Sequence, residues 1–474
     1  MNKTKKSANI LASLDESLVV LKTEKVTVSP GKHQIHISVK NPRHDRICPD
    51  CGNRCCRIKD SGDDVWAWHI PQGERVPCKV FYHKEHYLCS SCGRAFTEDI
   101  PWIFGTSHLT IPLKNCILKD LHHFTSKKEI ARINGVSSYY IDLVLDSIDI
   151  PVPSTLPEVV CLDETHSEVL ETLPLKTNWV KYTTNFSDGS TGQLLDILPF
   201  RTKKALAKYF FNNFTKEQRS KVKFLCSDMG PQYLYLAEKC FPNATVCLDN
   251  FHVTQRLNKA VHQVRLREMD YLLSKGEKKA YSDLKKRNRS LVTSAYNHTA
   301  YWKDKAPSIS ARIQNHIGRS TELRDAYAML QYFHRIFHSC WDFEDRCQQL
   351  DLWLDKFIPS TSEAVNKAAE SVKKHLPFIH NAWEYGLSNA VCEGNNNAIQ
   401  AIKDLSFGIR DFSYFRKRML LILGNPAIAR IYEREAFNDE DYDSFFFKEF
   451  PSLETYELAY DWKSPHRPFS KKGA

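Results

Sequence analysis

Two copies of one cysteine motif, CPDCG at Cys48–Gly52 and CSSCG at Cys89–Gly93, constrain the fold of this 474-residue chain more than any other feature. Each copy supplies two thiolates at the spacing found in tetrahedral Zn²⁺ sites, and its glycine permits the tight turn that follows. The segment between the copies is long enough for one or two hairpins. Because four thiolates leave no coordination position open, the sequence predicts one structural Zn²⁺ ion. Its ligands would be Cys48, Cys51, Cys89 and Cys92.

Other cysteines and histidines near these motifs leave alternatives open. One alternative is a set of scattered buried cysteines, and another is ligation by His83 or His86 in place of a thiolate.

The N-terminal residues lack the apolar segment of a signal peptide, and no stretch has the length of a membrane-spanning helix. We therefore expect a cytoplasmic protein that has no membrane partner and whose 15 cysteines are free or bind metal.

Residues 109–150 have a helical pattern that is typical of a helix-turn-helix. Ser126 and Glu129 have the spacing of a capping box at the start of one helix, Gly135 permits a turn, and Ser137 is placed to cap the next helix. The start of that second helix is where a recognition helix meets base edges, whereas the first helix is placed to contact phosphate. An ordinary helical hairpin is the alternative. The candidate DNA-contacting residues are Arg132, Ser138 and Tyr139.

Acidic side chains follow two predicted strands in the region after the prolines of residues 151–157. Val159–Leu162 has the pattern of a buried strand that ends at Asp163, and VKFLCSD predicts another that ends at Asp228. Parallel neighbours would bring these carboxylates together, where they repel each other unless a cation lies between them. Mg²⁺ prefers carboxylate oxygens, so a magnesium site is the functional interpretation. A helix cap, a surface charge or, for Asp228, a turn role is the alternative for each acid alone.

A third acid lies in a predicted helix over residues 390–405. Apolar residues recur there at helical spacing, and the polar residues fall largely elsewhere, as a stripe. The stripe consists of Glu393, Asn396, Asn397, Gln400 and Lys403. Gly394 inside a helix costs about 1 kcal/mol relative to alanine, which is reasonable where DNA or a metal approaches closely. Glu393 is therefore the candidate for a third carboxylate at the magnesium site.

The predicted elements around these acids follow the order of a ribonuclease-H-like fold. Residues 179–198 predict a hairpin with its turn at Ser187–Ser190, residues 203–214 a helix, and residues 222–226 and 244–248 two strands. Residues 251–383 are almost entirely helical in pattern. We expect a multidomain α/β protein, with an N-terminal zinc-binding domain and helix-turn-helix, then a ribonuclease-H-like catalytic core interrupted by an all-helical insertion.

Positive charge is concentrated in the predicted insertion. The formal net charge is +10, and residues 259–330 contain 15 Lys and Arg against seven Asp and Glu. At helical spacing Lys278, Lys285 and Arg289 lie on roughly one face, which is either a surface for DNA phosphate or a solvated face. The candidate DNA-contacting residues are Lys285, Lys286, Arg287 and Arg289.

Nearly the whole chain resembles the DDE transposases of bacterial insertion sequences, most closely the ISL3 family. The stretches that carry the resemblance include CPDCG, YLCSSCGRAFTE, VVCLDETH, CSDMGPQYLYLAEKCFPNATVCLDNFHVTQRLNKAV and SNAVCEGNNNAIQAIKDLSFGIRDFSYFRKRML. The resemblance implies that Asp163, Asp228 and Glu393 are the catalytic triad and bind two Mg²⁺ or Mn²⁺ ions. Asp249 and His252 match the D-x-x-H signature of related transposases, which implies a supporting role.

The implied function is that of a transposase that binds the terminal inverted repeats of an insertion sequence and catalyses metal-dependent DNA cleavage and strand transfer. Its partners would be transposon ends and target DNA. A homodimer or larger synaptic complex is expected because two ends must be paired, and the location would be cytoplasmic and nucleoid-associated in a bacterium. One alternative is a zinc-dependent DNA-binding regulator with an inactive nuclease-like fold, and another is a structure-specific nuclease.

Domain boundaries follow from these motifs. Residues 17–39 alternate in short β-like runs on either side of Ser29–Gly31, so the zinc-binding domain is expected to be rich in β-structure. The predicted domains are a β-rich zinc-binding domain over 1–108, a helix-turn-helix region over 109–150, a first part of the ribonuclease-H-like core over 155–258, a helical insertion over 259–385, the last helices of the core over 386–425, and a C-terminal tail over 426–474.

Overall fold

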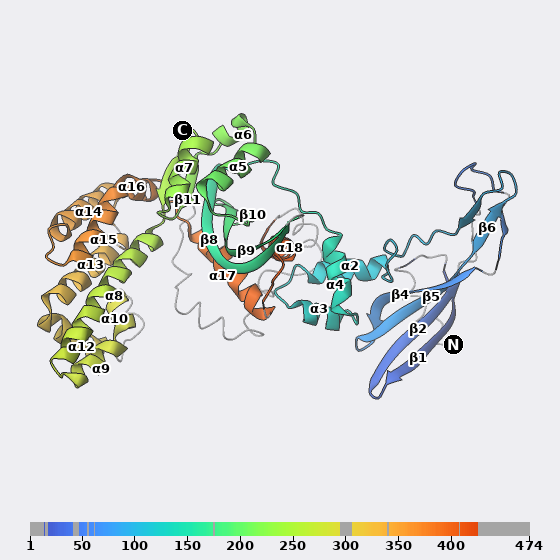
Figure 1. Ribbon diagram of the computed structural model, residues 1–474, viewed down its shortest axis with the longest axis horizontal. Coiled ribbons are helices and arrows are strands. Elements are labelled where there is room, and N and C mark those ends of the chain that lie inside the picture. Colours follow the sequence, from blue (N-terminus) through green and yellow to red (C-terminus); the bar gives the residue numbers. More distant parts are fainter. Residues whose placement is uncertain are drawn as a thin grey trace. The chain divides into compact units, whose positions relative to one another are not determined.

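The computed structural model describes residue 14 and residues 18–40, 47–54, 56–60, 62–173, 176–293, 306–338, 341–406 and 408–424. The predicted C-terminal tail, 426–474, lies outside these residues. The described chain is a mixed α/β structure with three β-sheets (Figure 1). Within it, no helix combines the length and the apolar character that crossing a bilayer requires.

The first sheet has four strands in the order β1-β2-β5-β4. Their bounds are Val19–Ser29, Lys32–Lys40, Val76–Lys84 and Asp63–Gln72, respectively. The strands expected on either side of Ser29–Gly31 are confirmed, and Gly31 makes their turn with a φ of 74°. Alternate residues of each strand, Ile37 and Val39 on β2 and Cys78 and Val80 on β5, are buried in one core with Trp102, as the two-residue period of a strand requires.

A second sheet carries the cysteine motifs on three short strands in the order β3-β6-β7. The strands are Cys56–Ile58, His86–Cys89 and Ala95–Thr97. Cys89 ends β6, Cys92 lies in the turn to β7, and Cys48 precedes β3, which pairs with β6. The pairing of β3 with β6 therefore brings the two motifs together.

Three helices follow, α2 (Ile111–Asp120), α3 (Lys127–Ile133) and α4 (Ser138–Asp146). The hydroxyl of Ser126 accepts a 3.1 Å hydrogen bond from the Glu129 amide. The carboxylate of Glu129, however, binds Arg132 (2.6 and 2.7 Å), so the described contacts form only half of the expected capping box. Ser137 occupies the cap position of α4, but its side chain makes no capping hydrogen bond. Gly135 makes the turn with a φ of 64°.

The third sheet has five strands in the order β10-β9-β8-β11-β12. Their bounds are Leu194–Leu198, Lys176–Asp188, Val159–Leu173, Phe224–Ser227 and Thr245–Leu248, respectively. Two expectations need correction. Strand β8 does not end at Asp163 but continues for ten residues in antiparallel pairing with β9. The β9–β10 turn lies after Asp188 rather than at Ser187–Ser190, and Gly192, with a φ of 82°, supplies its left-handed residue.

Helices cover both faces of this sheet. On one face, α5 (Lys203–Asn213) and α7 (Pro231–Cys240) pack against Leu162 and Phe186, and the short helix α6 (Lys216–Ser220) lies between them in the chain. On the other face, α17 (Ala390–Leu405) and α18 (Phe412–Leu423) pack against Val169 and Val180 (Figure 1). Neighbouring residues of a strand point to opposite faces, so both layers have apolar cores.

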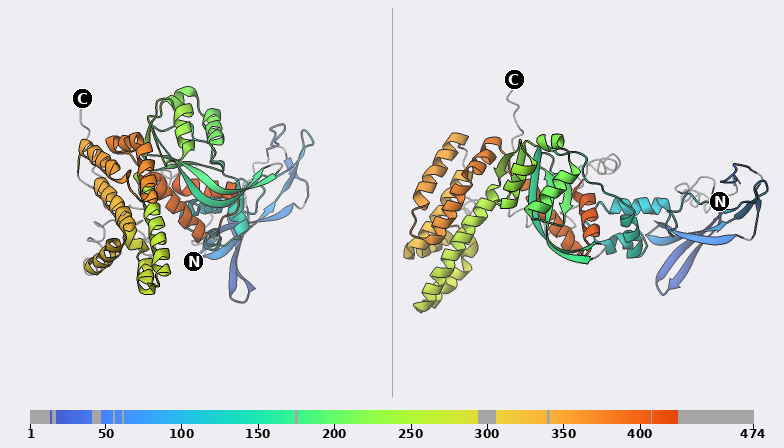
Figure 2. Two further views of the ribbon diagram at one scale, coloured as in Figure 1. Left: turned by 60° about the vertical axis from the view of Figure 1, so that its left-hand side comes forward. Right: turned by 45° about the horizontal axis from the view of Figure 1, so that its top comes forward.

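In the described part of the chain between β12 and α17, helices share one apolar core (Figure 2). They are α8 (Asn250–Ser274), α9 (Lys278–Lys286), α10 (Asn288–Val292), α12 (Ala306–Arg319), α13 (Thr321–His338), α14 (Phe343–Phe357), α15 (Glu363–Lys374) and α16 (Leu376–Tyr385). The single basic face expected through Lys278, Lys285 and Arg289 is wrong, because the helix breaks at Arg287, which has a ψ of 5°.

Candidate active site

Three aspartates follow equivalent positions in three adjacent strands. In the parallel pairing, Ser227 of β11 lies opposite Leu162 of β8 and opposite Leu248 of β12. The next residue in each strand direction is an aspartate: Asp163, Asp228 and Asp249. The structure thus places Asp163 and Asp228 on neighbouring strands, as expected, and adds Asp249 at the same level.

Glu393 joins Asp249 and His252 to form a tight acidic cluster. One donor atom of each side chain lies within 4.8 Å of the others. Asp249 caps α8 by accepting a hydrogen bond from the Phe251 amide, His252 lies in the first turn of α8, and Glu393 lies in the first turn of α17. The sequence predicted only a supporting role for Asp249 and His252, whereas both lie directly beside Glu393.

Asp163 completes the cluster, with its Oδ1 atom 4.0 Å from Nε2 of His252. Burial raises the pKa of Asp163 to about 6, against a lowering effect of His252. Burial and then the charge of the Asp249 carboxylate raise the pKa of Glu393 to about 9. Several carboxyl groups therefore share a poorly solvated space, where their charged forms repel one another.

The cluster has the properties of a cation site. Oδ2 of Asp249, Nε2 of His252 and Oε1 of Glu393 are buried, and in the part of the chain that the structure describes they have no hydrogen-bond partner outside the cluster; the Asp249 and Glu393 carboxyls can hydrogen-bond to each other only when one is protonated. Buried polar atoms are normally satisfied, so these three indicate a missing ligand. Carboxylate oxygens with one imidazole are suitable donors for Mg²⁺ or Mn²⁺. The residues present therefore fit a divalent cation.

Asp228 is placed differently from the other acids. Its Oδ1 atom accepts a 2.7 Å hydrogen bond from the Gly230 amide, which is the turn role considered as an alternative. Burial is the main cause of the raised pKa of Asp163; His252 and the Glu164 amide lower this pKa, and the charge of Asp228 adds a smaller raising effect. Asp228 thus stabilises a turn and also lies close enough to Asp163 to affect its pKa.

Asparagines of α17 attach the Glu393 helix to the sheet, and the sequence analysis did not identify this role. Asn396 donates a 2.9 Å hydrogen bond to Oδ2 of Asp163, and its own Oδ1 accepts from Asn185 and Thr165. Asn395 donates to the Ser187 hydroxyl at 3.0 Å. The available signal was the position of Asn396 in the polar stripe, one helical turn after Glu393.

Buried thiols lie next to the acidic cluster on the same face of the sheet. Cys161, Cys226 and Cys247 lie opposite one another in β8, β11 and β12, two residues before the three aspartates. Residues two apart in a strand lie on the same face, so the thiols lie next to the acids. With Cys392 of α17 they belong to one fully buried apolar group. These thiols exclude water from one side of the acidic cluster. This is one reason why burial raises the pKa values of Asp163 and Glu393.

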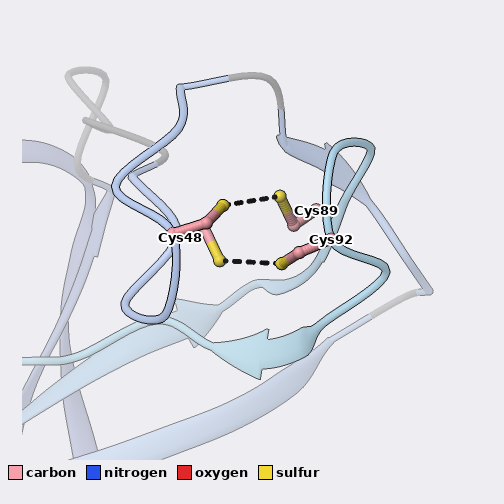
Figure 3. A group of neighbouring side chains, drawn as sticks. Cys48, Cys89 and Cys92 are labelled. Carbon is pink, nitrogen blue, oxygen red and sulfur yellow. Dashed lines mark hydrogen bonds between the residues drawn. The ribbon is translucent and has the colours of Figure 1, made fainter.

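The two cysteine motifs form a second candidate metal site (Figure 3). The Sγ atoms of Cys48 and Cys92 are 3.6 Å apart, as are those of Cys51 and Cys89, and all four lie within 4.8 Å of one another. Tetrahedral ligation with Zn–S bonds of about 2.3 Å places sulfur atoms about 3.8 Å apart, so this set fits Zn²⁺.

Each cysteine motif turns in the same way. The Gly52 amide donates to the Cys48 carbonyl at 2.9 Å, and the Gly93 amide donates to the Cys89 carbonyl at 3.0 Å. Both glycines have positive φ values, 66° and 72°. Hydrogen bonds from the Cys92 and Ser91 amides lower the pKa of Cys89 to about 6, whereas the pKa values of Cys51 and Cys92 are raised in the same group of thiols. Without a cation, one thiolate is therefore favoured and the other thiols keep their protons.

The histidines considered as substitutes for a thiolate are engaged elsewhere. His83 lies 2.8 Å from Asp64, and His86 lies 2.7 and 3.0 Å from Asp60 and Asp63. Neither belongs to the group of four thiols, so the alternative with a histidine ligand is not supported by the geometry.

Comparison with known proteins adds family membership to this geometry. Residues 161–419, more than half of the chain, match the family model of the ISL3 DDE transposases, which is described as a transposase. The chain belongs to the ISL3 family of DDE transposases. The matched region includes Asp163, Asp228 and Glu393.

Two relatives with detectable sequence similarity are transposases of insertion sequences. The transposase for insertion sequence element IS1001 of Bordetella parapertussis is 24% identical over 400 residues, which cover 81% of this chain and 90% of the relative. The transposase for insertion sequence element IS1557 of Mycobacterium tuberculosis is 23% identical over 245 residues, which cover 48% of this chain and 54% of that relative.

The candidate DNA-contacting residues of the transposase differ in their availability. Tyr139 is 65% exposed at the start of α4, beside the partly buried Ser138, and Arg132 is exposed but paired with Glu129. In the helical region, Lys285, Lys286 and Arg289 are exposed.

Arg287 has a different environment. Its guanidinium lies 3.2 Å from Asp283, which also lies 2.9 Å from His316, and only 17% of the Arg287 side chain is exposed. Arg287 therefore pairs with an acid of α9, and it is the Asp283 carboxylate that reaches His316 of α12. Because its guanidinium is mostly buried in this contact, Arg287 is less available to DNA than its exposed neighbours.

Proposed function

We propose that this transposase cleaves DNA at the ends of its insertion sequence and joins the freed 3′ ends to a target. The observation that supports this reaction is the convergence of Asp163, Asp249, His252 and Glu393, with buried donor atoms that lack described partners outside the cluster. Metal-dependent phosphoryl transfer needs such a group of hard donors beside a groove for nucleic acid. We propose a ribonuclease-H-like core around the cluster, because three antiparallel strands followed by two parallel strands have the expected order.

The residues that would hold divalent cations are the three acids predicted from sequence, together with Asp249 and His252. Two Mg²⁺ or Mn²⁺ ions are expected for a DDE enzyme. When bound, such cations activate the attacking oxygen and stabilise the leaving oxygen of an in-line displacement. Asp163 and Glu393 must lose their protons to bind them, because burial favours the neutral carboxyls. Asn396 donates to Oδ2 of Asp163, whereas Oδ1 accepts a 2.8 Å hydrogen bond from the Glu164 amide and lies 4.0 Å from Nε2 of His252.

The N-terminal part of the chain is proposed to recognise the DNA ends. We expect α3 and α4 to act as a helix-turn-helix, with Ser138 and Tyr139 toward bases and Arg132 toward phosphate. The cysteine site would hold one structural Zn²⁺ that stabilises the small sheet. Lys285, Lys286 and Arg289 would contact flanking or target DNA, and two chains or more would be needed to pair two ends.

A cleavage and joining assay with the purified full-length chain tests the proposed function. The substrate is a duplex with the terminal inverted repeat and its flanking DNA, in the presence of Mg²⁺ or of a chelator. We expect Mg²⁺-dependent cutting at the repeat boundary and joining to a second duplex. Binding without cutting would indicate the inactive regulator, and cutting without joining would indicate a plain nuclease. Either result would overturn the proposal.

A further inference from the structure

Helix α8 begins at the acidic cluster and has two distinct faces. Val253, Leu257 and Val261 are buried in the helical core. On the other side, at spacings of three or four residues, polar side chains continue outward from His252 of the cluster. These side chains are Gln255, Asn258, Lys259, His262 and Gln263. The polar face of α8 is therefore a continuous path that starts at the site of the proposed chemistry.

This polar face lines a groove that α10 completes. The cavity has a volume of about 450 Å³, and its polar lining consists of Gln255, Asn258, Lys259, His262, Gln263 and Asn288. The lining contains no carboxylate. Nδ1 of His262 lies 3.0 Å from Oδ1 of Asn288 and 3.2 Å from the Arg265 guanidinium, so it donates to the first or accepts from the second according to its tautomer. Lys259 is exposed and forms no ion pair with any residue that the structure describes.

One atom of the groove has no described partner. Oδ1 of Asn258 is buried and accepts no hydrogen bond within the described part of the chain. An unsatisfied buried acceptor is costly, so it indicates a donor that arrives with a ligand. Amide side chains form paired hydrogen bonds with base edges, and a lysine contacts phosphate as a point charge. The lining thus combines mostly apolar exposed surface, Val292 included, with amide groups, one lysine and no carboxylate. This combination suits the bases and phosphates of a nucleic-acid strand and does not suit an acidic partner.

We propose that this groove binds the DNA strand that leads away from the scissile phosphate. The proposal rests on the function proposed above and adds a position to it. Each residue of a helix advances about 1.5 Å, which places Lys259 about 10 Å and Gln263 about 16 Å beyond His252. A DNA strand advances about 3.4 Å per nucleotide, so the contacts fall about three to five nucleotides from the cut. Helix α8 thus acts as a ruler between the cluster and the bound strand.

Charge around the groove supports the same occupant. The adjacent helices α9 and α10 carry Lys285, Lys286 and Arg289 on exposed positions. Positive side chains beside a groove attract the phosphate backbone and release its counterions. The amides of the groove then contact the bases of the strand that the lysines and arginine hold.

The experiment places a single uncharged methylphosphonate at successive positions on either side of the cleavage site. The probe is a duplex with the terminal inverted repeat and its flanking DNA, and affinity is measured for three full-length proteins. These are the wild type, the triple variant Gln255→Ala, Lys259→Ala, Gln263→Ala, and the control Lys367→Ala, whose lysine lies on α15 and pairs with Glu363. Zinc content and thermal unfolding show whether each protein is folded.

For the wild type and the control we expect several-fold weaker binding when the methylphosphonate lies about three to five nucleotides from the cut, since one phosphate contact is removed. The triple variant should bind the unmodified duplex less tightly than the wild type does. A methylphosphonate at those positions should not weaken its binding further. If wild-type protein cuts the ends but shows no positional effect, or if the variant retains that effect, the groove does not bind this strand and the proposed function stands. If wild-type protein does not cut the ends at all, the proposed function fails and the groove inference fails with it.

Discussion

The side-chain amide of Asn396 donates a 2.9 Å hydrogen bond to Oδ2 of Asp163, and this contact ties helix α17 to strand β8. Glu393 lies one turn earlier on the same helix. The distance between the two candidate metal ligands is therefore set by a residue that is itself no ligand. The oxygen of Asn396 is held in turn by Asn185 and Thr165 of the sheet.

The first prediction concerns this contact. Asn396→Ala should lower kcat about 10- to 100-fold, because a hydrogen bond to a charged group contributes roughly 1.5–3 kcal/mol. The affinity for transposon ends should be unchanged, and the Mg²⁺ concentration needed for half-maximal rate should rise. The matched control is Asn397→Ala, which removes an exposed amide from the next position of α17. Equal rates for the two variants would contradict the positioning role.

The second prediction concerns the cysteine site. Metal analysis of the full-length chain should give about one Zn per chain, since four thiolates bind one tetrahedral ion. Cys48→Ser and Cys92→Ser should release that ion and lower the unfolding temperature of the N-terminal part, because structural zinc contributes folding free energy. Cys56→Ser is the control, since Cys56 lies near the site but outside the group of four. Wild-type metal content in either ligand variant would rule out the assigned ligands.

The third prediction concerns pH. Burial raises the pKa of Asp163 to about 6 and that of Glu393 to about 9, above unfolded values of about 4. The native state then binds more protons than the unfolded state between these limits, so the metal-free protein should lose stability as pH rises from about 4 to about 9. Thermal unfolding in chelator measures this loss, and Glu393→Gln should flatten its upper part.

Added Mg²⁺ should reverse the trend. A cation replaces the protons of the cluster, so its stabilising effect should be larger at pH 8 than at pH 5. A stability curve that is the same for wild type and Glu393→Gln would show that the Glu393 carboxyl does not titrate in this way.

The fourth prediction separates base reading from phosphate contact. Tyr139→Ala should reduce the preference for the inverted repeat over random DNA, because contacts to base edges carry sequence information. Arg132→Ala should weaken binding to both DNAs alike and reduce the slope of log affinity against log salt by about 1. A competition assay at several salt concentrations measures both quantities. Equal loss on both DNAs for Tyr139→Ala would mean that α4 is not the reading helix.

Local patterns were sufficient to predict much of this structure. The strands around Asp163 and Asp228 could be located because buried strands are short apolar runs, and parallel register then places the two aspartates at the same level of the sheet. The cysteine site was predictable because its spacing reflects the turn geometry itself. The full length of β8 was missed because buried Thr165 and Ser167 alternate with exposed His166 and Glu168, so polar residues occupy both the buried and the exposed positions.

Contacts between distant segments account for what was missed. The partners of Asn396 lie on β8 and β9, more than two hundred residues earlier, and no local pattern specifies them. The direct place of His252 beside Glu393 depends on how α8 and α17 meet at the sheet. Arg287 and Asp283 are four residues apart, a spacing at which side chains of a helix meet. The hydrophobic pattern did not show that the helix ends at Arg287, so this ion pair was not predicted.

The acids themselves give the fifth prediction. Asp163→Asn, Asp228→Asn and Glu393→Gln remove charge with little change of shape, and each should lower cleavage at least about 100-fold, since even outer groups around a metal are worth 10- to 100-fold. End binding should persist, because the proposed reading helices lie elsewhere in the chain.

Cleavage by Glu393→Gln tests the central claim most directly. One preparation each of wild type and variant is assayed for binding to the end duplex and for Mg²⁺-dependent cutting at the repeat boundary. We predict equal binding, with cutting by the variant below detection. Normal cutting by Glu393→Gln would contradict the claim that the acidic cluster is the catalytic centre.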